Sequence, residues 1–297
     1  MLNKSAVTPA TNHQPPTTIY IVGPTASGKS GLAMQVANLI NGEIICADSQ
    51  TIKKYLDIGT AKPTKSDQHK VKHHLIDIVE PYEEFSVAKF KQLAESAMKD
   101  IRSRNHIPIV VGGSGLYIDA LLYDFEFRPT TINLERQVLN NKTVSELQEM
   151  IKSRGLDLPK NELNPRHLIR VIESEGNTPQ KADIKPGSII IGLKLDKEEL
   201  ENRITKRVNK MFEEGFVEEV RTLIKRFGRV PNNFDSIGYL IVQRQLDGEI
   251  TELEAKELLI IAHRQYAKKQ RSWFRRNSDI MWFHSANDAF EHTKKLF

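Results

Sequence analysis

Short apolar runs alternate with amphipathic segments along the first 124 residues of the chain. The apolar runs are rich in β-branched residues, which predicts buried strands. Between them, apolar side chains recur every three or four positions, which predicts helices. Strands are expected at 17–22, 43–47, 74–79 and 107–111, and helices at 31–40, 87–104 and 116–122. This alternation is typical of an α/β fold, in which a parallel sheet carries helices on both faces.

The pattern changes over residues 125–186, where strand-like runs disappear and short helical stretches replace them. Helical periodicity is clearest over 143–153 and 167–174. We therefore predict a small helical domain at 125–186, inserted into a core that comprises residues 17–124 and 187–297.

The C-terminal part of the core begins with a predicted strand at 187–195 and closes with a predicted edge strand at 280–283. A helix is expected over 258–278, between these two strands. At the other end of the chain, residues 1–16 are polar and contain prolines, which predicts a disordered tail.

A glycine-rich segment follows the first predicted strand. It matches G-x-x-x-x-G-K-[ST], the P-loop, whose amides and following helix end bind phosphate groups. Lys29 would neutralise phosphate charge, and the Ser30 hydroxyl would bind Mg²⁺. The expected phosphate-binding residues are Gly23, Pro24, Thr25, Ala26, Ser27, Gly28, Lys29 and Ser30. This loop predicts a phosphate ligand, but it does not specify a nucleotide.

Two further polar segments follow predicted strands, at 48–51 and 112–114. The carboxyl ends of parallel strands meet at one edge of a sheet, where ligands bind. We therefore expect both segments to lie beside the P-loop in a single site.

Composition narrows the classes of protein that the chain can belong to. It has 297 residues, of which 27% are charged and 39% hydrophobic, as in a globular protein. No apolar run is long enough to cross a membrane, and residues 1–16 lack the apolar stretch expected of a signal peptide. We expect a cytoplasmic protein with no membrane partner, and we expect it to be monomeric. The single cysteine, Cys46, allows no internal disulfide, and its apolar neighbours predict a buried strand residue rather than a reactive thiol.

The formal net charge of +5 is unevenly distributed. Residues 258–278 contain six Lys or Arg and no acid, and on a helix Tyr266 and Trp273 would face the core. Four basic residues would share the opposite side: Arg264, Lys268, Arg271 and Arg275. By itself this basic stripe is as consistent with a solvated helix face as with contact to a phosphate backbone.

Together these motifs resemble the tRNA dimethylallyltransferases, also called tRNA isopentenyltransferases, from about residue 18 to residue 283. The most specific match is Asp57-Ile58-Gly59-Thr60-Ala61-Lys62-Pro63. Matching segments also lie at 23–30, 47–50, 73–77, 85–90, 111–117, 237–239 and 266–276. The resemblance implies transfer of a dimethylallyl group from dimethylallyl diphosphate to the exocyclic N6 of an adenosine in tRNA. That adenosine is 3′-adjacent to the anticodon in tRNAs that read codons beginning with U, and diphosphate is released.

The resemblance also implies roles for individual residues. The P-loop would hold dimethylallyl diphosphate with Mg²⁺ rather than a nucleotide. Asp48 would be the general base for the weakly nucleophilic adenine amine, although an Asp at this position could instead bind Mg²⁺, or do both. Thr25 and Arg207 would stabilise the diphosphate. Without the resemblance, Arg207 is better explained as a solvent-facing helix charge.

In the family, the target adenine of the tRNA anticodon stem-loop must leave its stack to reach the site. The tRNA-binding residues that the resemblance implies are Asp48, Ser49, Gln50, Thr51, Ser114, Arg136, Arg166, His167, Arg170, Gly238, Tyr239, Arg264, Lys268, Arg271 and Arg275. The chain departs from the family pattern at His167, where Arg is common, and at Leu240, where Lys or Arg is common. Its insertion is also short.

Three alternatives remain open on the residues alone. A small-molecule P-loop kinase would share the phosphate-binding loop. A related prenyltransferase would use free adenine nucleotides as acceptors. A noncatalytic RNA-binding or nucleotide-switch module would need no general base, so Lys29, Ser30 and Asp48 together argue against it.

Overall fold

The computed structural model describes residues 17–83, 85–125, 133–176, 183–231, 234 and 236–297. Contacts divide the chain into two compact units, one formed by Met1–Leu122 with Ile184–Phe297 and the other by Tyr123–Asp183. We refer to them as the core unit and the helical unit. The prediction of a disordered tail at 1–16 lies outside the described residues.

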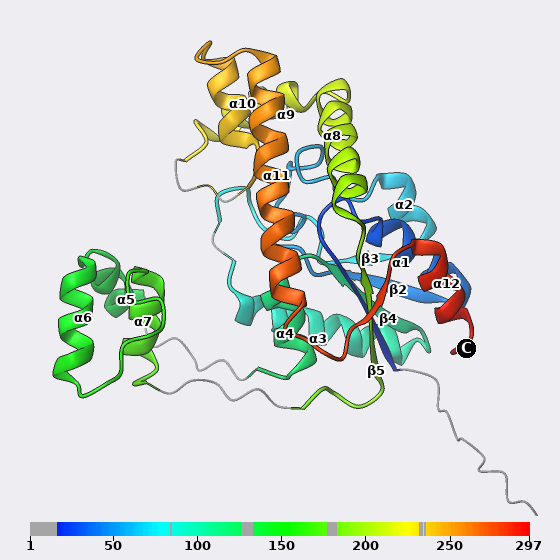
Figure 1. Ribbon diagram of the computed structural model, residues 1–297, viewed down its shortest axis with the longest axis horizontal. Coiled ribbons are helices and arrows are strands. Elements are labelled where there is room, and N and C mark those ends of the chain that lie inside the picture. The colour runs from blue at the N-terminus through cyan, green and yellow to red at the C-terminus, as the bar shows by residue number, and fades with distance from the viewer. Residues whose placement is uncertain (1–16, 84, 126–132, 177–182, 232–233, 235) are drawn as a thin grey trace, which may run out of the picture. The chain divides into compact units, whose positions relative to one another are not determined.

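A six-stranded parallel sheet forms the centre of the core unit (Figure 1). Its strands are β1 (Thr18–Val22), β2 (Gly42–Cys46), β3 (His73–His74), β4 (Ile107–Gly112), β5 (Ser188–Leu193) and β6 (Met281–Phe283). They lie in the order β3-β2-β4-β1-β5-β6. All residues of β1 are buried, as expected of a central strand with both faces covered. The predicted α/β fold is confirmed, and β6 is an edge strand as the sequence predicts.

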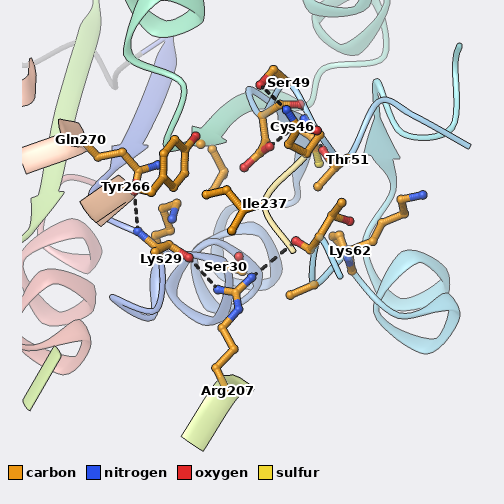
Figure 2. Close-up of a pocket in the computed structure, with 18 of the residues that line it drawn as sticks. Lys29, Ser30, Cys46, Ser49, Thr51, Lys62, Arg207, Ile237, Tyr266 and Gln270 are labelled. Atoms are coloured by element: carbon orange, nitrogen blue, oxygen red, sulfur yellow. Dashed lines mark hydrogen bonds between the residues drawn. The ribbon is translucent and has the colours of Figure 1, made fainter. Parts of the chain in front are cut away.

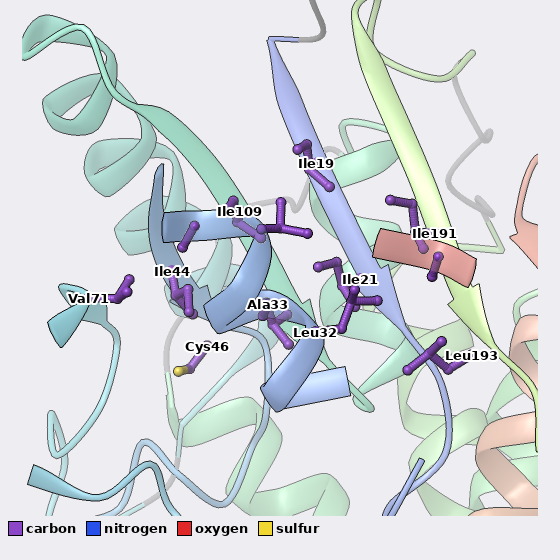
Figure 3. Close-up of a cluster of buried hydrophobic side chains, with 14 residues drawn as sticks. Ile19, Ile21, Leu32, Ala33, Ile44, Cys46, Val71, Ile109, Ile191 and Leu193 are labelled. Carbon is purple, nitrogen blue, oxygen red and sulfur yellow. The ribbon is translucent and has the colours of Figure 1, made fainter. Parts of the chain in front are cut away.

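Helices cover both faces of this sheet. They are α1 (Lys29–Ile40) and α12 (Ala286–Lys294) on one face, and α3 (Val87–Ser103) and α4 (Gly115–Leu122) on the other. Figure 3 shows the apolar cluster under α1, which joins Leu32 to strand residues and includes Ala289 of α12. Cys46 belongs to this cluster, and burial raises the pKa of its thiol to about 12, so it is the buried strand residue that the sequence predicts. On the opposite face, the rings of Phe90 and Tyr117 stack with centroids 4.1 Å apart.

Four further helices form a second layer next to the sheet edge at which the strands end (Figure 1). They are α8 (Lys197–Glu213), α9 (Phe216–Phe227), α10 (Tyr239–Leu246) and α11 (Glu252–Phe274). Their shared apolar cluster includes Leu56 from the segment after β2, together with Phe216 and Tyr239. The rings of Phe216 and Tyr239 meet edge to face, with centroids 5.1 Å apart. This packing holds α8 and α11 beside the ends of the strands.

The helical unit contains α5 (Asn133–Asn140), α6 (Val144–Ser153) and α7 (Pro165–Glu173). Its small core consists of Leu139, Leu147, Ile151, Leu168, Ile169 and Ile172. Capping explains two of the helix starts: the Thr143 hydroxyl accepts from the Glu146 amide, and Asn164 caps α7 ahead of a proline at its first position. Residues 126–132 and 177–182 of the predicted insertion lie outside the described residues.

Two predicted elements differ from the structure by more than two residues at one end or both. The strand expected at 74–79 is wrong beyond His74, because Leu75 and Asp77 have φ angles of 63° and 56°, which no strand accommodates. The chain turns away from the sheet after His74. The short helix α2 (Lys65–Lys70) lies just before β3 in the sequence. The helix expected at 258–278 begins earlier and ends at Phe274. Among the described residues, no helix is both long and apolar enough to cross a membrane.

Candidate functional site

A pocket of about 710 Å³ opens in the core unit where β1, β2 and β4 end (Figure 2). Its walls come from the P-loop, the 48–51 segment after β2, the 59–63 turn, α8 and α11. We call it the strand-end pocket. The three polar segments that follow strands therefore lie together, as the sequence predicts.

The P-loop forms the floor of the strand-end pocket. Gly28 has a φ of 92°, a left-handed conformation that glycine adopts without strain, and α1 begins at the next residue. Lys29 Nζ donates to the Pro24 carbonyl at 3.0 Å. Burial lowers the pKa of Lys29 from 10.5 to about 8, with nearby Arg207 acting in the same direction and Asp48 opposing it. Ser30, in the first turn of α1, is exposed and lines the pocket.

Arg207 of α8 reaches back to the P-loop, as Figure 2 shows. Its Nη1 donates to the Thr25 hydroxyl at 3.1 Å, and its Nη2 lies 3.4 Å from the Thr60 carbonyl. Burial lowers the pKa of Arg207 from its ordinary value, with Asp48 opposing the shift. The solvent-facing alternative for Arg207 is thus wrong. The resemblance pairs Thr25 with Arg207, and the structure places them in contact.

The Asp48 segment forms a tight polar turn opposite the P-loop. Asp48 Oδ1 accepts a hydrogen bond from the Gln50 amide at 2.9 Å, which leaves the second carboxylate oxygen available to the pocket. The Ser49 amide donates to Ser114 Oγ at 3.1 Å. Ser236, just before α10, donates through its hydroxyl to Gln50 Oε1. Ser114 therefore supports the Asp48 turn directly.

Sequence reasoning missed Gln270 as a site residue. This buried side chain of α11 accepts from the Thr25 amide at 2.7 Å and donates to the Gly113 carbonyl at 3.0 Å. It thereby ties the P-loop to the loop after β4. The only sequence signal for Gln270 is its position in the family-matching segment 266–276. A glutamine among basic residues does not by itself indicate a catalytic or binding role. His263 of α11 was missed too: it lines the pocket with both ring nitrogens unpartnered among the described residues, and burial lowers its pKa to about 4.

The basic stripe lies on the exposed side of α11. Arg264, Lys268, Arg271 and Arg275 are all exposed, with Arg275 at the C-cap, and Arg264 Nη2 lies 3.6 Å from a carboxylate of Glu201. On the inner side, Tyr266 lines the strand-end pocket. Trp273 is half-buried, and its indole nitrogen donates to Asp119 Oδ2 at 3.0 Å.

Two residues expected to contact tRNA are buried. Gly238 and Tyr239 lie inside the second layer of the core unit, and the Tyr239 hydroxyl donates to Glu219 Oε1 at 2.7 Å. The Tyr239 side chain is fully buried here, and a tRNA contact of this segment stays a prediction. The ring of Tyr239 packs in the apolar cluster of the second layer, and its hydroxyl is hydrogen-bonded, so both parts of the side chain have partners.

Four other expected tRNA contacts lie in the helical unit. Arg136 of α5 donates to both carboxylate oxygens of Glu173 at 3.1 Å. Arg166, His167 and Arg170 are exposed on one helix, α7, whose opposite face packs into the core of the helical unit. Arg166 and Arg170 thus give the helical unit an exposed cationic surface of its own.

The residues of the strand-end pocket fit a hydrated Mg²⁺ ion. Mg²⁺ prefers oxygen ligands, retains several waters and uses one or two protein groups together with phosphate oxygens. The Ser30 hydroxyl and the Asp48 carboxylate both line the pocket and supply such oxygens. No cluster of three or more His, Cys, Asp or Glu suited to a metal occurs within the described part of the chain.

Several known proteins are similar to this chain. A family model described as IPP transferase matches residues 52–277. The tRNA dimethylallyltransferase of Anoxybacillus flavithermus is 39% identical over 285 residues, 91% of each chain, and that of Acetivibrio thermocellus is 37% identical over 94% of each. The tRNA isopentenylpyrophosphate transferase of Bacillus halodurans has a crystal structure that matches with a TM-score of 0.72 at 34% identity, covering 94% of this chain and 95% of that one. A eukaryotic dimethylallyltransferase acting on tRNA shares the fold, with a TM-score of 0.74 at 24% identity over 90% of this chain and 73% of that one.

Proposed function

This chain belongs to the IPP transferase family, and on that premise we propose the reaction that its strand-end pocket catalyses. The protein is a tRNA-modifying prenyl-group transferase. Its donor is dimethylallyl diphosphate, and its acceptor is the exocyclic N6 of the adenosine 3′-adjacent to the anticodon in tRNAs that read codons beginning with U. Diphosphate is the second product. We further propose that it acts as a monomer in the cytoplasm, where its tRNA substrate is found.

One observation carries the proposal. A P-loop, an arginine bonded to that loop and a carboxylate at the next strand end all line a single pocket. The loop and Arg207 suit the charged end of a prenyl diphosphate. Asp48, across the pocket, suits the acceptor amine. Both substrates can therefore meet inside this one pocket.

The reaction exchanges one bond for another. The adenine N6 attacks C1 of the dimethylallyl group as the bond between C1 and the diphosphate oxygen breaks, and the electron pair leaves with diphosphate. Asp48 accepts the proton that N6 must lose, since the lone pair of an exocyclic amine is delocalised into the ring. The Thr25 hydroxyl, Arg207 and Lys29 bind the diphosphate oxygens, whose negative charge grows during bond breaking.

Mg²⁺ would be held by the Ser30 hydroxyl, with Asp48 as a further candidate ligand. When bound, it neutralises part of the diphosphate charge. If Asp48 coordinated the ion directly, cation binding and general-base catalysis would compete for its carboxylate. With one oxygen of Asp48 occupied by the Gln50 amide, the free oxygen is better employed as the base.

The tRNA would be bound by exposed cations. The basic stripe of α11 suits the phosphate backbone. On the helical unit, Arg166 and Arg170 of α7 are exposed cations that also suit it, with His167 exposed beside them. Ser49, Gln50 and Thr51 line the strand-end pocket beside Asp48, where an unstacked adenine would enter.

The decisive experiment combines purified protein with labelled dimethylallyl diphosphate, Mg²⁺ and unmodified tRNA, followed by nucleoside analysis. We expect label on N6 of a single adenosine. Label on AMP but not on tRNA would favour the nucleotide prenyltransferase. Thermal stabilisation by ATP with Mg²⁺, but not by dimethylallyl diphosphate with Mg²⁺, would instead favour a P-loop kinase.

A further inference from the structure

The most family-specific motif of the sequence, residues 57–63, has no role in the reaction described above. In the structure it is a turn whose inner side lines the strand-end pocket through 59–63. Its outer side faces α9 and α10. Contacts on these two sides connect a carboxylate of α9 to the arginine that binds the P-loop.

On the outer side, the Glu219 carboxylate binds three consecutive backbone amides. Oε2 accepts from Asp57 at 2.9 Å and from Ile58 at 2.7 Å, and Oε1 accepts from Gly59 at 3.1 Å. Oε1 also accepts the Tyr239 hydroxyl at 2.7 Å. Successive amides that converge in this way form a nest for an anion, and charge-assisted bonds of this kind are among the stronger hydrogen bonds.

Gly59 is needed for this docking. A Cβ added at Gly59 would lie 2.3 Å from Cε2 of Phe216 and 2.8 Å from Cε2 of Tyr239. These rings are backed by the apolar cluster of the second layer, so they have no free volume to move into. The turn is therefore seated on the two rings as well as on the Glu219 carboxylate.

On the inner side, the turn meets Arg207. Within the described parts of the chain, the guanidinium has two acceptors, the Thr60 carbonyl and the Thr25 hydroxyl of the P-loop. The Nε of Arg207 is buried and has no partner among the described residues. The direction of this guanidinium therefore depends on the Thr25 hydroxyl at 3.1 Å and on the Thr60 carbonyl at 3.4 Å, and that carbonyl lies three residues along from the start of the Glu219 nest.

Resting on the proposed function, we infer that Glu219 is a positioning residue. It holds the 57–60 turn so that the Thr60 carbonyl keeps Arg207 directed at the P-loop and the leaving diphosphate. Lys62 secures the far end of the same turn, since its ammonium is bonded to the carboxylates of Asp57 and Asp77 at 2.6 Å each. Glu219 acts on the reaction only through Arg207, and this distinguishes it from a residue that merely stabilises the fold.

A double-mutant cycle tests this directly. Glu219→Gln keeps the size of the side chain but removes its charge and places an amide NH₂ against backbone donors. We expect it to lower turnover per folded molecule by roughly 10- to 100-fold, as misplacement of a catalytic group does. In an Arg207→Gln background the same change should cost less than about twofold, because the positioned group is already absent. Glu218→Gln is the matched control, since this exposed neighbour pairs with Arg221 alone among the residues that the structure describes, and the change should leave turnover unchanged.

A second readout does not depend on activity. Calorimetric titration with inorganic diphosphate and Mg²⁺ should show weaker binding for Glu219→Gln in the Arg207 background and no further weakening in the Arg207→Gln background. Equal losses in both backgrounds, or unchanged diphosphate binding and turnover in folded Glu219→Gln, would overturn the inference. If Glu219→Gln does not fold, Glu219→Asp replaces it in the same cycle with the same criteria. If the wild-type protein does not prenylate tRNA, that result contradicts the proposed function. The diphosphate titrations contain no tRNA, so they test the role of Glu219 independently of it.

Discussion

The strand-end pocket and the basic stripe both place positive charge where an anion would bind, but they do so in different surroundings. In the pocket, burial lowers the pKa values of Lys29 and Arg207, and both side chains are bonded to neighbouring backbone or hydroxyl groups. On α11, the four basic side chains of the stripe are exposed. A buried cation depends on the position of its neighbours, whereas an exposed cation acts nearly independently and is screened by salt. Single substitutions should therefore affect catalysis in the pocket and only affinity on the stripe.

The largest expected effect is that of Asp48→Asn. The change keeps the shape of the side chain and its contact with the Gln50 amide but removes the proton acceptor. Turnover should fall by about 10²–10⁴, the usual weight of general-base catalysis, while the affinities for tRNA and donor stay within a few fold. Single-turnover rates with pre-bound tRNA measure this. Turnover near that of the wild type would show that Asp48 is not the proton acceptor. It would contradict the assignment of catalysis to the pocket and of affinity to the stripe.

Trp273→Ala probes the inner side of α11, behind the stripe. The indole packs against α4, where a Cβ on Gly115 would lie 2.2 Å from it, and it is bonded to Asp119. Because the ring is only half-buried, the decrease in unfolding free energy should be below the roughly 3–5 kcal/mol of a fully buried aromatic. Denaturant unfolding measures it. The Lys268→Ala variant on the outer side should unfold like the wild type, and a comparable decrease in both variants would contradict this assignment of the two sides.

The pH dependence of donor binding sharpens the contrast. Lys29 binds an anion as its protonated form, and the pKa of Lys29 in the free protein is about 8. Affinity for dimethylallyl diphosphate should be constant below that pH and fall above it by at most about tenfold per pH unit. Bound diphosphate raises the pKa of Lys29, so the decrease ends at a higher pH. Titration calorimetry from pH 7 to pH 10 checks this, and Lys29→Arg should remove the pH dependence because arginine stays charged. An identical slope in Lys29→Arg would assign the effect to another group.

The smallest effect per residue is expected on the stripe. Each charge removed from Lys268, Arg271 or Arg275 should weaken tRNA binding and reduce the log–log salt slope by roughly 0.7–0.9 for every phosphate that is no longer neutralised. Chemistry on bound tRNA should not change. Replacing Lys294 and Lys295, the exposed last residue and C-cap of α12, provides the control. Unchanged affinity and slope in a folded triple variant would make the stripe a solvated helix face.

Much of the fold could be predicted from local patterns. The P-loop, the strands around it and the edge strand β6 follow from residue type and periodicity over a few positions. The strand predicted at 74–79 failed because apolar residues alone do not exclude the positive φ angles of Leu75 and Asp77. Asp77 is instead bonded to Lys62, a residue outside the predicted strand.

Local sequence patterns identify the candidate residues of the strand-end pocket, because the P-loop spacing and the strand-end polar segments involve only a few neighbouring positions. How these residues are supported depends on contacts between segments far apart in the chain. The tertiary structure joined Gln270 to the Thr25 amide across 245 positions and turned Arg207 from an apparent surface charge into a ligand of Thr25. It also seated the 57–63 turn on Glu219 and buried Tyr239. These contacts arise from the packing of α8 to α11 against the strand ends, and helical periodicity fixes which side of a helix is buried but not which partner it meets.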